Sequence, residues 1–188
     1  MTHAYRPWRY SMTEDSRLRL FNVSEPFEIT QNEFQALWPL VTNVWTQFSY
    51  GFPEKGDEWT VYACRRLKHR KSSGRKDGVE PEKRRKTNVR DPKLCSAKIR
   101  ITRIISRQTV RIEPYNAEPA IHMHPIDESD MFKKSQALHD LISAEAVKNY
   151  RPPAIAAAVR ELAPSVLGEG TRAQYIRTQD VANIHHAV

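Results

Sequence analysis

The amino-acid sequence predicts an α+β fold, in which a small antiparallel β-sheet is flanked by an N-terminal helix and a C-terminal helical unit. Residues 58–64, EWTVYAC, are rich in β-branched and aromatic side chains, which is typical of a strand. Residues 95–104, CSAKIRITRI, alternate apolar and basic side chains and indicate a half-buried strand with one basic face. Residues 109–114 alternate again and stop at a proline, whereas residues 135–150 carry apolar side chains at helical spacing.

The two cysteines of the chain belong to this predicted sheet, and a His-x-His pair follows it. Cys64 ends the first strand, Cys95 opens the second, and His122 and His124 come after the third. Two thiolates and two imidazoles form a complete tetrahedral ligand set for zinc. We therefore predict one structural Zn²⁺, with a ligand at each of three strand ends and Met123 facing away from it. The alternative is a disulfide between the two cysteines, which leaves the histidine pair without a role.

This order of residues resembles the WRKY/glial-cells-missing superfamily of zinc fingers. The similarity is nearest to the DNA-binding domains of far-red-impaired-response proteins and Mutator-like transposases. It is carried by a strand ending in Cys64, a long insert, the strand CSAKIR from Cys95, a further strand and the segment HMHP, and it spans roughly residues 45 to 130. The resemblance implies a Cys2His2 zinc site inside a β-sheet and sequence-specific binding of double-stranded DNA by one strand. The WRKYGQK strand is missing, so no base-reading residue can be transferred.

In the arrangement that this resemblance implies, the strand before the first ligand strand enters the major groove. By position that strand lies within residues 46–55. Its polar and aromatic side chains are candidates for contact with bases or phosphates, namely Gln47, Ser49, Tyr50 and Lys55. An ordinary hairpin packed by its aromatic residues is the alternative.

Charge is concentrated in the same part of the chain. The net charge is +8 and the isoelectric point is about 9.6, which favours an acidic polymer or an anionic surface as partner. Residues 64–111 contain 18 Lys and Arg against 4 Asp and Glu, an excess of 14 positive charges. The remaining residues contain 12 basic and 18 acidic side chains, an excess of 6 negative charges. A uniformly solvated surface would not divide its charge in this way.

The insert at residues 65–90 is polar, contains two glycines and lacks an apolar period, so we predict a mobile loop. Its Lys and Arg side chains would contact phosphates, and the cluster EKRRK also fits a nuclear-import signal. A loop that is merely solvated is the alternative. The basic candidates for DNA contact, in the insert and on the second strand, are Arg65, Arg66, Lys68, Arg70, Lys71, Arg84, Arg85, Lys98 and Arg100.

Helices are predicted on both sides of the sheet. Thr30 and Glu33 form a capping box, which starts a helix that would pack against the sheet. Residues 1–20 show no clear periodicity of apolar side chains, and we predict an extended N-terminal arm there. Ser129 or Asp130 is expected to cap a short helix. A helix is predicted at residues 135–150, and after it two short helices, 154–163 ended by Pro164 and another from Thr178, suggest a helix-turn-helix-like unit.

The predicted organisation has three parts: an arm and buttressing helix at 1–44, a zinc-binding β domain at 45–130, and a helical unit at 131–188. The predicted function is a nuclear, sequence-specific DNA-binding protein, either a transcription regulator or a transposase-derived domain, and not an enzyme. A metal-independent basic protein that binds RNA or chromatin is the alternative, and a metal-dependent nuclease is a further one. We expect no membrane partner, since no apolar run of membrane-spanning length and no signal peptide occur. We also expect no small-molecule substrate. The oligomeric state stays open.

Overall fold

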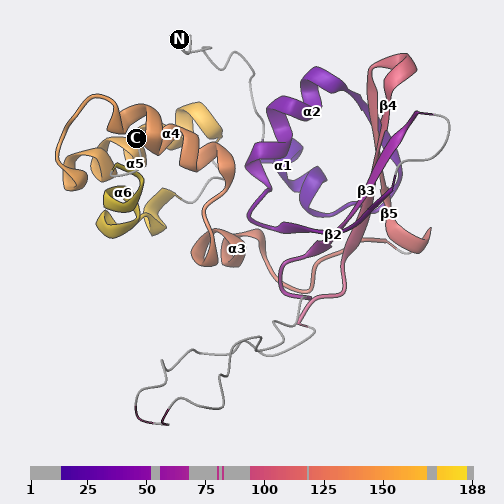
Figure 1. Cartoon of the computed structure of the whole chain (residues 1–188), viewed down its shortest axis with the longest axis horizontal. Helices are drawn as coiled ribbons and strands as arrows, with labels where there is room; N and C mark the ends of the chain where they lie inside the picture. The colour runs from indigo at the N-terminus through magenta and orange to yellow at the C-terminus, as the bar shows by residue number, and fades with distance from the viewer. Residues whose placement is uncertain are drawn as a thin grey trace.

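The fold was obtained as a computed structural model of the chain, which describes residues 14–51, 56–67, 80, 82, 94–117, 119–168 and 173–185. It is an α+β fold built on a five-stranded antiparallel sheet, as the sequence predicts (Figure 1). The strands lie in the order β1-β5-β4-β3-β2, so that β1 and β2 form its two edges. Their bounds are Phe27–Thr30 for β1, Trp45–Gly51 for β2, Glu58–Cys64 for β3, Lys98–Ile104 for β4 and Thr109–Pro114 for β5.

The register of the strands gives the sheet an inner and an outer face. Ile101 lies opposite Thr60 on one side and Ile112 on the other, and alternate residues of each strand share its face. The inner face carries most of the apolar side chains, namely Tyr62, Ile99, Ile101, Val110 and Ile112. The outer face carries an aromatic ring and several charges, among them Trp59, Lys98, Arg100, Arg111 and Glu113.

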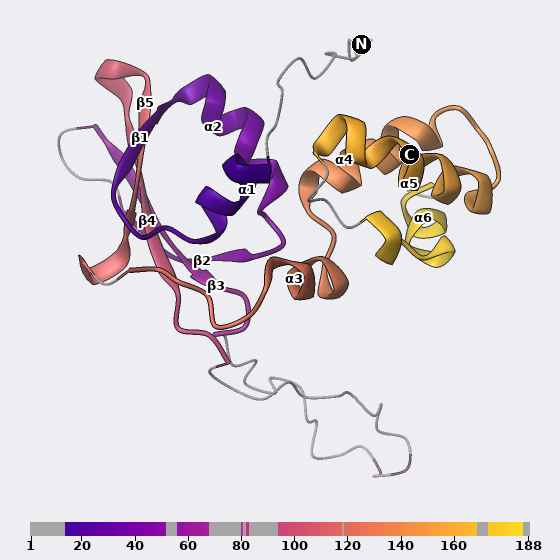
Figure 2. The same ribbon diagram turned by 180° about the vertical axis from the view of Figure 1, so that it is seen from behind.

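Helices α1 (Glu14–Phe21) and α2 (Gln31–Leu37) cover the inner face (Figures 1 and 2). The capping box at the start of α2 is confirmed: the Glu33 amide donates to the Thr30 hydroxyl, and the Thr30 amide donates to the Glu33 carboxylate. Helix α1 was not predicted. It buries Leu20 and Phe21 but also Arg17, which is 3% exposed, so its buried side does not read as apolar in the sequence.

The C-terminal helices form a second apolar cluster beside the sheet. The helices that follow the sheet are α3 (Ile126–Phe132), α4 (Gln136–Ala146), α5 (Pro152–Leu167) and α6 (Thr178–His185). Short 3-10 helices lie at Trp38–Leu40, Ile105–Arg107, Tyr115–Ala117 and Ala173–Tyr175. The second cluster is formed by α4, α5, α6, Leu40, Ala173 and Ile176, without α3. No helix in the described ranges is both long and apolar enough to cross a membrane.

Two predictions about these helices are wrong. Pro164 does not end α5, which continues to Leu167. Proline removes one backbone donor, and burial of Ala163 and Leu167 on the same side of the helix offsets that loss. Neither Ser129 nor Asp130 caps α3, because Pro125 occupies the capping position and both residues lie buried within the helix.

A buried polar group joins the helical unit to the sheet. The Asp130 carboxylate accepts hydrogen bonds from the Arg17 guanidinium at 2.5 Å and from the Asn43 side chain at 2.8 Å. The Arg17 Nε also donates to the carbonyl oxygen of Leu40 at 3.3 Å. Arg17 and Asp130 are 3% and 6% exposed, so water screens this pair little. The group connects α1, α3 and the turn before β2, and α3 lies between the two clusters in Figures 1 and 2.

Replacing Asp130 by alanine should lower the free energy of unfolding by about 3–5 kcal/mol, because the buried guanidinium of Arg17 would lose the carboxylate that balances its charge. Chemical denaturation followed by circular dichroism measures this loss. Glu161→Ala, at an exposed position of α5, serves as the control and should change stability by less than about 0.5 kcal/mol. A similar small effect of both substitutions would contradict the structural role of the group.

Candidate metal centre

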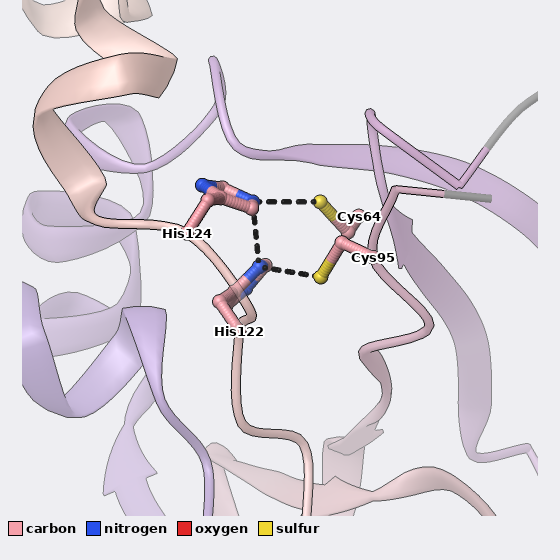
Figure 3. A group of neighbouring side chains, drawn as sticks. All are labelled: Cys64, Cys95, His122 and His124. Carbon is pink, nitrogen blue, oxygen red and sulfur yellow. Dashed lines mark hydrogen bonds between the residues drawn. The ribbon is translucent and has the colours of Figure 1, made fainter. Parts of the chain in front are cut away.

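Four buried side chains converge at one end of the sheet, and they are the two cysteines and the two histidines singled out in the sequence (Figure 3). One ligand atom from each of Cys64, Cys95, His122 and His124 lies within 4.8 Å of all the others. Cys64 Sγ is 3.3 Å from His124 Nε2, Cys95 Sγ is 3.3 Å from His122 Nδ1, and the two ring nitrogens are 3.2 Å apart. Both cysteines are free thiols, so the structure does not contain the alternative disulfide.

These separations suit a tetrahedral ion. Typical zinc–sulfur and zinc–nitrogen bonds place sulfur and nitrogen ligands about 3.5 Å apart and two nitrogen ligands about 3.3 Å apart. The three distances given above are within about 0.2 Å of these values, and no pair of the four ligand atoms is more than 4.8 Å apart. The four residues could therefore hold one metal ion, and each of them is at most 8% exposed.

Each cysteine is positioned by the end of a central strand. Cys64 is the last residue of β3, and its amide donates to the Ala97 carbonyl at 2.8 Å. Cys95 lies shortly before Lys98, the first residue of β4. The chain turns directly after Cys64, which brings the Arg66 amide to 3.4 Å from the Cys64 sulfur. A backbone donor at this place stabilises a thiolate.

The histidines do not lie at a strand end, contrary to the prediction of one ligand at each of three strand ends. They lie in the loop between β5 and α3, which is bounded by Pro119 and Pro125 and pairs with no neighbouring strand except at one bridge from Ala120 to Val23. The expected alternation nevertheless holds, because both histidines are 8% exposed and Met123 is 79% exposed. The His122 amide donates to the Asn22 side chain at 3.0 Å, which fixes the loop to the end of α1.

The two rings present different nitrogens to the site. In His124, Nδ1 lies 3.0 Å from the Pro125 carbonyl, which makes it the protonated nitrogen and leaves Nε2 as the ligand. In His122, Nδ1 faces Cys95, and the ring is stacked on Phe21 with 4.1 Å between centroids and 13° between planes.

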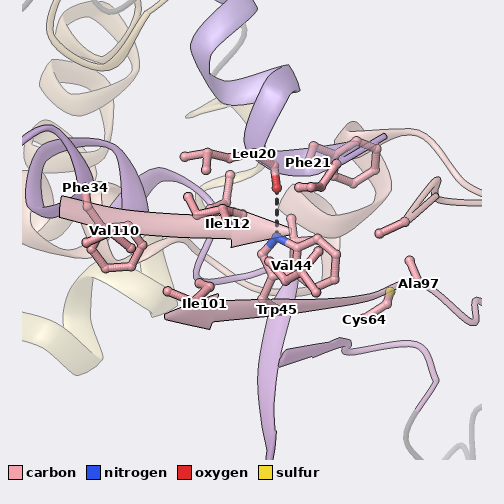
Figure 4. Close-up of a cluster of buried hydrophobic side chains, with 14 of the residues drawn as sticks. Leu20, Phe21, Phe34, Val44, Trp45, Cys64, Ala97, Ile101, Val110 and Ile112 are labelled. Atoms are coloured by element: carbon pink, nitrogen blue, oxygen red, sulfur yellow. Dashed lines mark hydrogen bonds between the residues drawn. The ribbon is translucent and has the colours of Figure 1, made fainter. Parts of the chain in front are cut away.

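Trp45 completes the wall around His122, with 4.7 Å between the ring centroids, and its indole donates to the Leu20 carbonyl at 3.0 Å (Figure 4). The sequence did not predict that Phe21, Asn22 and Trp45 support the site. They lie far from the two histidines along the chain, and no local pattern connects them to the ligands.

Burial and a hydrogen bond between the two thiols set the protonation states of three of the four side chains. A hydrogen bond between the two thiols lowers the pKa of Cys95, and the same bond together with burial raises the pKa of Cys64. Burial lowers the pKa of His122, which keeps its imidazole neutral near pH 7 with a lone pair free. Metals bind thiolates and neutral imidazoles, so Cys95 and His122 are in the form that coordination requires, whereas Cys64 would release its proton when a metal binds.

The structure distributes the predicted DNA-contact residues over several surfaces. Gln47 and Tyr50 are exposed on the edge strand β2, and Ser49 is half-buried there. Lys98 and Arg100 lie on the outer face of the sheet. The other basic candidates fall either in the turn after Cys64 or outside the described residues, the latter being Lys55, Lys68, Arg70, Lys71, Arg84 and Arg85.

The two arginines that follow Cys64 make contacts within the protein. The Arg65 guanidinium donates to the carbonyl oxygens of Asn43 and Trp45 at 3.1 and 3.2 Å, and thereby ties the start of β2 to the end of β3. Arg66 forms an ion pair with Glu128 on α3 and lies 5.4 Å from the ring of Phe132. Both arginines therefore stabilise the segments that surround the metal centre.

Comparison of the chain with models of protein families, with curated proteins and with solved structures gave no match. Function is therefore inferred from the metal centre and from the surfaces that it organises.

Purified protein should contain one metal ion per chain, and replacing Cys95 by serine should weaken metal binding by more than about a hundredfold, because a ligand is lost. Elemental analysis gives the stoichiometry, and titration with Co²⁺ gives the affinity and the thiolate-to-metal absorption. Removal of the ion by a chelator should lower the melting temperature markedly, since the binding free energy of structural sites, about 10–16 kcal/mol, contributes to folding.

Met123→Ser is the matched control, because this residue lies between the two histidines but points to solvent. It should bind metal as the unmodified chain does. Metal-free protein with unchanged melting behaviour would show that the four side chains are only a buried polar cluster.

Proposed function

We propose that this chain is a sequence-specific double-stranded DNA-binding protein that carries one structural zinc ion and acts in the nucleus. It would serve as a transcription regulator or as the DNA-binding part of a transposase-derived protein. We also propose that it is related to the WRKY/glial-cells-missing superfamily. The order of the ligands, with two cysteines at central strands and a His-x-His pair after the last strand, supports that relationship.

Zinc is the metal that this ligand set suits best. Two sulfur and two nitrogen ligands in a tetrahedral arrangement are typical of structural zinc sites. Four protein ligands leave no coordination position for water or a substrate, and the site is buried, so a structural role is favoured over a nuclease activity.

The observation that carries the proposal is the connection between the metal centre and β2. Trp45, the first residue of β2, lies opposite Cys64 in the register and packs on the His122 ring. The Arg65 side chain binds the carbonyl oxygens of Asn43 and Trp45 and so holds the main chain at the start of β2. Filling the centre with a metal would therefore fix the start of an edge strand whose further residues, Gln47 and Tyr50, are exposed.

An exposed edge strand of this kind fits the major groove. The groove admits a β-ribbon, and base edges are read there by side-chain amides, with glutamine recognising adenine. Gln47 is exposed and Tyr50 is 65% exposed, so both side chains are accessible to DNA. The excess of 14 positive charges within residues 64–111 would supply the phosphate contacts that give affinity.

Selection of binding sites from a random duplex library tests this function, followed by affinity measurements on the selected site. Gln47→Ala and Tyr50→Ala should each weaken specific binding by about tenfold, because a good base contact contributes roughly 1–3 kcal/mol. Chelation should remove specific binding, because the start of β2 loses its anchor.

Gln35→Ala, an exposed glutamine of α2, is the control for Gln47→Ala and should bind as the unmodified chain does. Binding that survives chelation, shows no sequence preference and depends only on salt would contradict the proposal. That result would favour the alternative of a metal-independent basic protein that binds RNA or chromatin.

A further inference from the structure

The outer face of the sheet carries a cluster of rings and cations whose aromatic side chains take no part in the duplex contact proposed for Gln47 and Tyr50. Helices α1 and α2 cover the opposite, inner face of the sheet (Figures 1 and 2). The cluster consists of three aromatic residues and two basic residues, namely Phe48, Trp59, Tyr115, Lys98 and Arg100. We call it the aromatic platform.

A bulge in β2 shapes one edge of the platform. The register between β2 and β3 shifts between Gln47 and Ser49, so that Phe48 is the extra residue. Its ring lies against Lys98, with 4.6 Å from Nζ to the ring centroid, and the residue is 54% exposed. A large apolar ring held at the surface in this way offers a face to a ligand.

The shifted register also accounts for the position of Trp59. After the bulge, Gly51 lies opposite Trp59, and a Cβ atom at residue 51 would lie 2.3 Å from the Trp59 ring. The indole therefore lies against the backbone of β2, and any larger residue at position 51 would displace it. Glycine at this position therefore leaves the space that the Trp59 ring occupies.

Cations alternate with the rings across the strands. The Arg100 guanidinium lies 5.6 Å from the Trp59 ring and 5.5 Å from the Tyr115 ring, and Lys98 Nζ lies 5.7 Å from the Tyr115 ring. Glu113 is the nearby carboxylate, 2.9 Å from Arg111 and 4.0 Å from Arg100. Within the described part of the chain, Lys98 forms no ion pair, so its charge is available to an anion.

We propose that the aromatic platform binds an unpaired strand of nucleic acid, with bases stacked on Phe48 and its neighbouring rings and phosphates beside Lys98 and Arg100. Rings that accept bases and cations that follow the backbone are the two components of single-strand binding. A duplex cannot use the rings, because its bases are already stacked and expose only their edges in the grooves. This site goes beyond the proposed function, since it lies on another surface and takes a different ligand.

Fluorescence anisotropy with labelled oligothymidine and oligouridine of about twelve nucleotides tests the proposal on the full chain. Phe48→Ala should weaken binding about tenfold, because base–aromatic stacking is lost. Lys98→Gln should reduce the slope of log affinity against log salt by about 0.7, the value expected for one phosphate contact on a single strand.

Two controls separate stacking and phosphate contact from general effects. Tyr150→Ala removes an aromatic residue that is 59% exposed in the helical unit, and it should leave the affinity unchanged. Arg103→Gln removes a cation from the inner face of the same strand β4, where it pairs with Glu58, and it should leave the salt slope unchanged. Melting curves of all variants establish that each is folded.

Equal effects of Phe48→Ala and Tyr150→Ala, or no binding of either oligonucleotide, would overturn the proposal. Comparable affinity for both oligonucleotides would support a site that contacts only bases and phosphates. A preference for one of them would support the same site with an additional contact to the sugar. The duplex site is scored separately through Gln47→Ala, so failure of duplex binding and failure of single-strand binding are distinguishable.

Discussion

The convergence of Cys64, Cys95, His122 and His124 at one end of the sheet is the constraint on which the other parts depend. These residues come from the end of β3, the segment before β4 and the loop before α3, so a shared ion would join segments that are distant in sequence. Phe21 of α1 and Trp45 of β2 close the wall around His122. The centre thereby fixes the helices on the inner face as well as the edge strand. In a chain with 39% hydrophobic residues, such a cross-link would offset a modest core.

The helical unit is attached to the same end of the molecule by two short-range connections. Helix α3 begins two residues after His124, and Arg66, which follows Cys64, pairs with Glu128 on that helix. The buried group of Arg17, Asn43 and Asp130 adds a third connection. A buried ion pair contributes little stability by itself but is costly to break, so it favours one arrangement of the two apolar clusters over others.

The bulge in β2 separates two surfaces that differ in chemistry. Gln47 and Tyr50 lie at the edge of the sheet, where a duplex groove can receive them, whereas Phe48 lies on the outer face beside Lys98. One extra residue in a short strand thus supplies both an edge for hydrogen bonding and a ring for stacking. If both proposals hold, the protein can engage paired and unpaired nucleic acid through neighbouring sides of one sheet.

The sequence by itself determined the three central strands, the capping box of α2 and the four residues of the metal centre, because each depends on local alternation or on rare residue types. It did not reveal α1, whose buried side includes Arg17, or the continuation of α5 through Pro164, which burial of Leu167 stabilises. Only the tertiary structure decided that the histidines lie in a loop and that Phe21 and Trp45 support them. It also decided that β2 carries a bulge beside Gly51. These features depend on contacts between residues far apart in the chain, and no local pattern encodes such contacts.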